Sequence, residues 1–200
     1  MSKQIWKGSA LLAPVPPVLV SCGTGDAANL ITVAWAGTVC THPPRLSISV
    51  RKSRHSYPLI CESGEFVVNL PTKKLLRAID WCGVKSGKDV NKFEAMGLTA
   101  APANTISCPV LAESPINLEC KVFQQIELGS HDLFLADITA IQVDESLLDA
   151  TGKLCLDKAE LIAYAHGSYY SLGSQLGTFG YSVRKKKKNR KPQCTHQPRT

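Results

Sequence analysis

The chain has 200 residues and a hydrophobic content of 44%, which suits one globular domain, and no apolar run approaches the roughly 20 residues that span a bilayer. The formal net charge is +7, but residues 184–200 hold eight of the 23 Lys and Arg residues and no acidic residue. The remaining 15 basic and 16 acidic residues nearly cancel, so residues 1–183 carry no broad positive surface for a polyanion such as nucleic acid.

The chain begins with a proline-rich segment that resembles a secretory signal, because residues 11–22 are mostly apolar and follow two lysines. However, Pro14, Pro16 and Pro17 interrupt the apolar stretch that a signal helix needs. We therefore expect no signal peptide and a first strand at residues 18–22.

Residues 23–28, GTGDAA, satisfy the G-x-G-x-x-A pattern of dinucleotide-binding loops. In such a loop a helix follows the glycines, and an acidic residue lies about twenty positions later. Here a strand pattern follows, and no acidic residue lies at that distance. We interpret the segment as a hairpin turn built on Gly and Asp.

Short β-branched and apolar segments predict further strands between turn residues. They are residues 30–37, 46–50 and 65–70. Two short helices are expected among them. One opens at Ser53, and the other runs over residues 72–83 with Thr72 as its cap and Gly83 as its end.

The second half of the body predicts one long β-hairpin. From residue 115 the sequence alternates, with Ile116 and Cys120 on one face and Asn117 and Glu119 on the other. It continues to residue 128, turns at GSHD and returns over residues 133–143. Strands outnumber helices and do not alternate with them, so we expect a mainly β fold, a barrel rather than a doubly wound sheet.

The eight cysteines predict free thiols rather than disulfides or a metal site. No two are closer in sequence than Cys108 and Cys120, and there is no C-x-x-C pair. The five histidines also lack metal-ligand spacing. We expect no metal, and buried thiols acting as small apolar groups in a reducing cytoplasm.

Residues 49–56, SVRKSRHS, pack three cations and a histidine between a strand and a helix. Such a cluster is either solvated or binds an anion. Its hydroxyls and backbone N–H groups converge at a helix start, which favours the phosphate of one small ligand over nucleic acid or a membrane. Arg51, Lys52 and Arg54 cannot all face one phosphate, so some of them are expected to be solvated, Arg54 among them.

Several segments carry a resemblance to a known family. They are NLITVAWAGTVCTHPPRLSISVRKSRHSYPLI followed by GEFVVNLP, then NKFEAMGLT, GSHDLFLADI and AYAHGSYYSLGSQLGTFG. In this order and spacing, from about residue 6 to about residue 187, the chain resembles the flavin reductase-like, FMN-binding split-barrel family, in its flavoredoxin-type branch. The resemblance implies a Greek-key antiparallel split β-barrel with accessory helices, which forms a homodimer and binds FMN at the barrel rim.

The resemblance also implies the residues of the site. The FMN contacts are expected from Asn29, Trp35, Ser56, Lys92, His131 and Tyr164. Ser56, where relatives carry threonine, and Lys92 match the phosphate contacts. His131 matches the histidine at the face where the nicotinamide approaches and is the candidate catalytic residue. Trp35 and Tyr164 match positions beside the flavin, although both also suit core aromatics.

We therefore expect an FMN flavoprotein that acts as an NAD(P)H-dependent flavin reductase or a flavoredoxin-like oxidoreductase, with NADH or NADPH as co-substrate. The alternatives are an FMN electron carrier that serves a redox partner protein without meeting nicotinamide, and a flavin-binding module without turnover. Residues 1–183 are expected to form the domain. Residues 184–200 are expected to be a disordered basic tail, the one part that suits nucleic acid.

Overall fold

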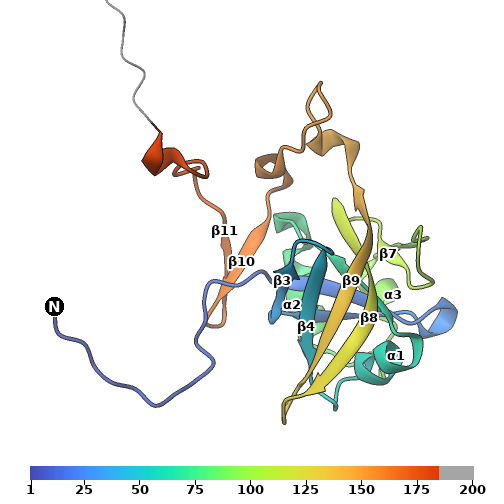
Figure 1. Ribbon diagram of the computed structural model, residues 1–200. Helices are drawn as coiled ribbons and strands as arrows, with labels where there is room; N and C mark the ends of the chain where they lie inside the picture. The colour runs from blue at the N-terminus through green and yellow to red at the C-terminus, as the bar shows by residue number, and fades with distance from the viewer. Residues whose placement is uncertain (185–200) are drawn as a thin grey trace, which may run out of the picture.

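The computed structural model describes residues 1–184, which form a mainly β protein with few helices (Figure 1). Its centre is a seven-stranded antiparallel sheet in the order β2-β1-β5-β8-β9-β4-β3. The strands of this sheet are β1 (Val18–Cys22), β2 (Asn29–Val33), β3 (Ala36–Cys40), β4 (Arg45–Val50), β5 (Glu65–Asn69), β8 (Ile116–Glu127) and β9 (Asp132–Val143). The prediction of a mainly β, antiparallel fold is confirmed.

The sheet has to curl into a barrel because its two edge strands, β2 and β3, are consecutive in the chain. If the sheet were flat, these edges would lie about 29 Å apart at about 4.8 Å per strand. Only Ala34 and Trp35 join them, and such a link spans at most about 11 Å. Trp35 therefore lies where the two edges of the curled sheet approach each other.

The strand predictions are mostly confirmed, with one correction. β1 matches residues 18–22, and β8 and β9 form the long hairpin. The expected single strand over residues 30–37 is wrong, because the chain passes from β2 to β3 at Ala34 and Trp35. A continuous apolar run gives no sign of this break, since both strands are apolar. The GTGDAA segment forms the β1–β2 hairpin connection, as interpreted.

The barrel interior is filled from every strand of the sheet, β3 contributing only the partly buried Ala36, and the side chains of Ile48, Phe66 and Phe134 have almost no exposure there. The outer face of β8 is covered as well over the first residues of the strand. Asn117 and Glu119 lie on that face and are buried, so alternation along β8 separates two buried faces rather than a buried and a solvated one.

The helices lie around the barrel. The α-helices among them are α1 (Ser56–Ser63), α2 (Leu76–Val84) and α3 (Lys92–Met96). The 3-10 turns of the described chain are η1 (Gly25–Ala27), η2 (Lys73–Leu75), η3 (Glu145–Leu147), η4 (Leu156–Ala159) and, on the segment that leaves the barrel, η5 (Tyr181–Val183). α1 begins at Ser56, three residues after the predicted Ser53. Thr72 does cap the next helical segment, accepting from the Lys74 N–H, but α2 ends at Val84, one residue beyond Gly83.

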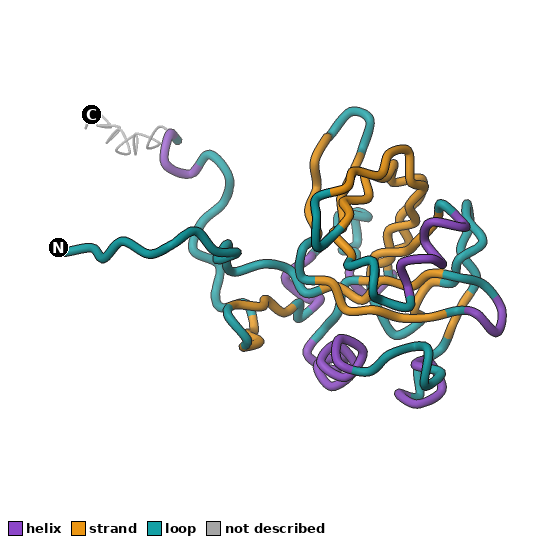
Figure 2. The backbone as a smooth tube through the Cα atoms, turned by 90° about the horizontal axis from the view of Figure 1, so that it is seen from below, coloured by secondary structure: helices purple, strands orange, loops and turns teal. Residues whose placement is uncertain are grey.

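Two peripheral hairpins complete the described chain. β6 (Ala100–Ala101) pairs with β7 (Val110–Leu111), and β10 (Ile162–Ala165) pairs with β11 (Ser168–Ser171). The β10–β11 hairpin, the N-terminal segment and the chain after β11 extend from one side of the barrel (Figures 1 and 2). No helix of residues 1–184 is long and apolar enough to cross a membrane. Apart from Arg184, the basic tail predicted at residues 184–200 lies outside the described residues.

Candidate functional site

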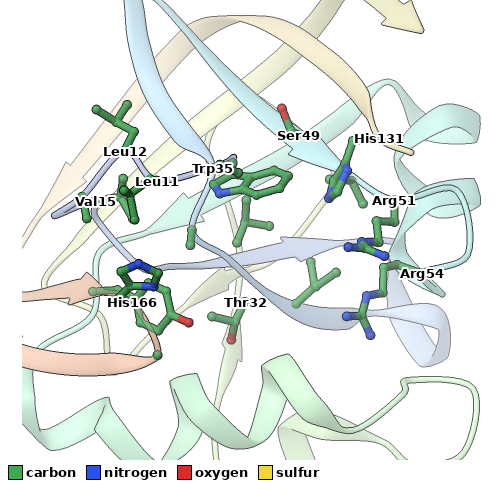
Figure 3. Close-up of a pocket in the computed structure, with 18 residues that line it drawn as sticks. Leu11, Leu12, Val15, Thr32, Trp35, Ser49, Arg51, Arg54, His131 and His166 are labelled. Carbon is green, nitrogen blue, oxygen red and sulfur yellow. The ribbon is translucent and has the colours of Figure 1, made fainter. Parts of the chain in front are cut away.

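Two pockets adjoin each other beside β2 and the start of α1. The outer pocket has a volume of about 380 Å³ and is lined by Trp35, Arg51, His131 and Tyr164 among others (Figure 3). The inner pocket, of about 150 Å³, is lined by residues that include the predicted phosphate contacts. The two pockets are neighbours, because Ile31 and Arg54 line both of them. The six predicted site residues thus divide three and three between them.

The inner pocket contains a buried cation without a matching anion. Lys92 begins α3, where Asn91 caps the helix, and only 3% of Lys92 is exposed. Its Nζ donates to the Cys82 carbonyl at 2.7 Å, and no carboxylate of residues 1–184 pairs with it. Burial lowers the pKa of Lys92, and the nearby charge of Arg54 lowers it further. An ammonium group in this position is stabilised by a bound anion.

Ser56 and Asn29 form the polar wall of the same pocket. The Asn29 side-chain amide donates to Ser56 Oγ at 2.7 Å, and both residues are buried. This bond occupies an acceptor site of the hydroxyl, so the Ser56 O–H is free to donate to a ligand. Gly87 packs against the amide so closely that a Cβ there would overlap Asn29 Oδ1. The backbone at Gly87 therefore packs against the Asn29 side-chain amide and restricts its position.

The three cations of the loop before α1 separate in the structure. Lys52 turns toward the β8–β9 hairpin, where it pairs with Glu127 and lies 3.7 Å from Asp132 Oδ1. Arg51 and Arg54 point into the pockets instead (Figure 3). Arg54, expected to be a solvated cation, is exposed but lines both pockets. Of the three cations, Lys52 is therefore the one whose charge is paired with carboxylates outside the pockets.

An aromatic pair borders the outer pocket. The rings of Trp35 and His131 lie 4.5 Å apart between centroids, inclined at 47°. Trp35 is 45% exposed, so it is not a core aromatic, and its carbonyl accepts from the Ser49 N–H at 2.9 Å. Burial lowers the pKa of His131, and the charges of Arg51 and Arg54 lower it further. Both effects favour the neutral form of the imidazole.

A hydrogen-bond network holds the hairpin tip that carries His131. Asp132 is buried, and its Oδ2 accepts from the Tyr57 hydroxyl at 2.7 Å and from the Gln125 amide at 2.6 Å. Tyr57 belongs to α1 and Gln125 to β8. The network therefore connects the start of α1, which carries Ser56, to the tip that carries His131.

Tyr164 reaches the outer pocket from β10. Its backbone N–H and C=O both bond Val15 at 2.9 Å, which brings the N-terminal segment alongside. Its ring lies 5.3 Å from that of Tyr169. Leu11 and Leu12 add apolar side chains to the same pocket (Figure 3).

Several pocket residues were not predicted from the sequence. They are Leu11, Leu12, Thr32, Gly87 and His166. His166 had one usable signal in the sequence, because it precedes Gly167 where a tight turn can form. In the structure this turn joins two strands, and His166 adopts a φ of 53°, which few residues tolerate. Thr32 lies on β2 between the predicted Asn29 and Trp35, whereas Leu11, Leu12 and Gly87 lie on other segments that the fold brings to the pockets.

These pockets combine a cation-lined recess with an aromatic wall. Such a site suits a ligand with one anionic end and one planar end. Within residues 1–184, no group of three or more His, Cys, Asp or Glu side chains is arranged to hold a metal ion.

Comparison with known proteins gives consistent results. The family model described as "Flavin reductase like domain" matches residues 11–173. An uncharacterized protein of Archaeoglobus fulgidus is 33% identical over 138 residues, covering 69% of this chain and 77% of its own.

Solved structures of similar fold come from the same family of proteins. Flavoredoxin of Desulfovibrio vulgaris (Miyazaki F) superimposes with a TM-score of 0.85 at 31% identity, over 92% of this chain and 100% of that one. Flavoredoxin from Methanosarcina acetivorans gives 0.82 at 27% identity, with the same two coverages. An FMN-binding domain of a flavin reductase-like enzyme from Shewanella baltica gives 0.70 at 25%, over 82% and 88%. The fold is therefore that of the split-barrel proteins, and the chain belongs to the flavin reductase-like domain family.

Proposed function

We propose that the protein is a flavoprotein that binds FMN, with the phosphate in the inner pocket and the ring system in the outer one. One observation carries this proposal: Lys92 is a buried ammonium group that has no acidic partner within residues 1–184. A buried charge is costly unless it is paired. A phosphate monoester supplies the missing partner.

The other residues of the inner pocket fit a phosphate. The Ser56 hydroxyl is free to donate to it, since Asn29 already bonds the oxygen. Lys92 keeps donors beyond the one bound to Cys82, because an ammonium group has three. Ser56 also begins α1, so a phosphate beside it lies at the positive end of the helix dipole, although the Tyr57 N–H already donates to the Arg54 carbonyl.

The outer pocket suits a planar ring with one accessible face. Trp35, His131 and Tyr164 all line it, which supports their predicted contacts with flavin. FMN held there would supply the redox chemistry, electron transfer between a reduced nicotinamide and an acceptor. Neutral His131 donates a hydrogen bond to the reacting groups, and it is not required as a base.

Absorption spectroscopy tests this function. We expect the purified protein to take up FMN and its flavin band to bleach when NADH or NADPH is added without oxygen. A protein that stays colourless with FMN contradicts the proposal. If dithionite bleaches the band and neither nicotinamide does, the protein is an electron carrier instead. The 31% identity to a flavoredoxin favours that second candidate.

We further propose that the protein is a cytoplasmic homodimer, with residues 1–183 as the functional domain. The segments that leave the barrel expose large apolar side chains, which favours burial against a second copy. They are Trp6, Leu12, Leu172, Leu176 and Phe179. All seven cysteines of residues 1–184 are free thiols, in keeping with a reducing compartment. Light scattering at micromolar concentration measures the mass, and a monomer contradicts the dimer.

A further inference from the structure

The position of the His131 side chain is not set by polar contacts of its own with the barrel. Within residues 1–184 its imidazole has one hydrogen-bond contact, 2.9 Å from Nδ1 to the hydroxyl of Ser130, which is exposed on the same hairpin tip. The imidazole also packs against the Trp35 ring, with 4.5 Å between centroids. Its place in the pocket therefore depends on the backbone that carries it.

The next residue, Asp132, ties that backbone to the body of the protein. Asp132 lies on the face of β9 that carries Phe134 into the core, because side chains two positions apart on a strand share a face. Only 2% of Asp132 is exposed, and its Oδ2 accepts from Tyr57 on α1 and from Gln125 on β8. The carboxylate thus attaches the start of β9 to two other elements.

The hairpin does not need this carboxylate to close. The backbone of Asp132 pairs with Glu127 across the hairpin, and the Leu128 N–H donates to the His131 carbonyl at 3.1 Å. Burial of the carboxylate is costly, because its Oδ1 accepts no hydrogen bond from the described chain and lies 3.7 Å from the Lys52 ammonium group. A buried group that is incompletely satisfied and unnecessary for pairing is expected to serve another purpose.

The bond between Tyr57 and Asp132 has a fixed direction. The hydrogen bond to Asp132 raises the pKa of Tyr57 to about 12, and the same bond lowers the pKa of Asp132. At neutral pH the phenol therefore donates and the ionised carboxylate accepts. Hydrogen bonds to an ionised acceptor are stronger than neutral ones, so this bond suits a permanent attachment.

We infer that Asp132 is a positioning residue that keeps the His131 imidazole against Trp35 for reduction of the flavin. Tyr57 and Gln125 hold Asp132 for this purpose. Asp132 lines neither pocket, so it acts through its neighbour and not on the flavin itself. The inference rests on the proposed function, because it takes His131 as the group that donates to the reacting groups.

NMR of the full-length protein before FMN is added measures where the imidazole lies. The ring current of Trp35 displaces the resonances of a histidine ring packed against it, and His131→Ala identifies the signal. Tyr57→Phe removes one donor to Asp132 and keeps the aromatic ring. We expect it to move the signal toward that of a free histidine. Tyr170→Phe is the matched control and should not move it, because Tyr170 is 55% exposed on β11 outside both pockets.

Stopped-flow reduction of the bound flavin measures the consequence. At saturating NADH or NADPH, Tyr57→Phe should slow reduction by about three- to tenfold and leave FMN affinity unchanged, whereas Tyr170→Phe should match wild type. In a His131→Ala background, Tyr57→Phe should have no further effect, because the two residues act through one group. Asp132→Asn, which keeps an acceptor oxygen, should retain more of the rate than Asp132→Ala.

Three results overturn the inference while FMN binding stands. The first is a Tyr57→Phe variant whose His131 signal or reduction rate matches wild type. The second is an equal slowing by Tyr57→Phe with and without His131, which means that the network acts on another group. The third is a loss of FMN affinity in Tyr57→Phe, which assigns the network to holding Ser56. If neither nicotinamide reduces the wild-type flavin, the reductase function fails, and the NMR signal alone decides whether Asp132 positions His131.

Discussion

Glu119 and Lys92 are both buried charged residues, and the protein treats them in opposite ways. Glu119 is 0% exposed, yet its two carboxylate oxygens accept five hydrogen bonds from Asn104, Thr105 and Gln142. Lys92 is 3% exposed and donates one bond, to a carbonyl. The contrast teaches that a buried charge satisfied by its own chain serves the fold, whereas one left unsatisfied is kept for a ligand.

The pKa shifts express the same contrast. Burial alone raises the pKa of Glu119, but the hydrogen bonds from Asn104, Gln142 and Thr105 outweigh it and bring the pKa to about 2. For Lys92, burial lowers the pKa, and no carboxylate of the described chain compensates. The fold thus stabilises the charged form of Glu119 and leaves the charged form of Lys92 to be stabilised by an anion.

The largest effect is expected from breaking the satisfied charge. Glu119→Gln replaces an acceptor oxygen with a donor that faces other donors, so it should lower the free energy of unfolding by about 3 kcal/mol. Urea denaturation measures this loss. Glu62→Gln, on the exposed face of α1, is the control and should change little. Equal stability of the two variants would show that the Glu119 network is dispensable.

The same variant has a pH signature. The pKa of Glu119 is about 2 in the folded state against an ordinary value of 4.5. Its stabilisation is therefore present above pH 4.5 and is lost as the pH falls from 4.5 through 2. Wild-type protein should lose stability more steeply over this range than Glu119→Gln. If the stability of the two proteins falls equally with pH below 4.5, the low pKa of Glu119 is contradicted.

The next largest effect concerns the unsatisfied charge. Lys92→Met should weaken FMN binding by about ten- to hundredfold, because a charge-assisted contact contributes about 1.5 to 3 kcal/mol. The apoprotein should be at least as stable as wild type, since a buried ammonium group is removed. Arg54→Ala should cost less FMN affinity, because solvent screens an exposed cation.

Flavin titrations and urea denaturation of both variants measure these quantities. An Arg54→Ala variant that loses more FMN affinity than Lys92→Met would place the phosphate over the loop before α1 rather than in the inner pocket. A marked loss of apoprotein stability in Lys92→Met would show that Lys92 serves the fold, as Glu119 does.

The outer pocket should show an effect on rate alone, because a polar group there serves the reaction rather than binding. His131→Ala should leave FMN affinity unchanged and slow anaerobic reduction by NADH or NADPH by about tenfold to a hundredfold, the scale of one lost polar contact. Stopped-flow absorbance of the flavin band measures the rate. His166→Ala, on the opposite wall of the pocket, is the matched control and should change it less. Similar rates for the two variants would remove the special role of His131.

The sequence predicted the parts of the fold that depend on local pattern. Alternation and the GSHD turn located the β8–β9 hairpin, and the strand after GTGDAA excluded a dinucleotide loop. The break at Trp35 was not predictable from an unbroken apolar run, because it results from the curl of the whole sheet. The late start of α1, at Ser56, places that hydroxyl at the first helical position.

The site was predictable only as a set of residues, through the family resemblance. The sequence does not show that Lys92 is buried, that Lys52 turns away or that Arg51 turns inward, because each depends on contacts between distant segments. Glu119 illustrates the same limit. It occupies a polar position of an alternating strand, which predicts an exposed side chain. In the structure the segment containing Asn104 and Thr105 covers that face and buries it.

The central claim is that the inner pocket binds a terminal monophosphate through Lys92. Calorimetry with FMN, riboflavin and FAD tests it most directly, on wild type and Lys92→Met. Wild-type protein should bind FMN about ten- to hundredfold more tightly than riboflavin, which lacks the phosphate, and more tightly than FAD. In Lys92→Met the difference between FMN and riboflavin should shrink by a similar factor. Equal wild-type affinity for FMN and riboflavin, or a preference for FAD, would contradict the claim.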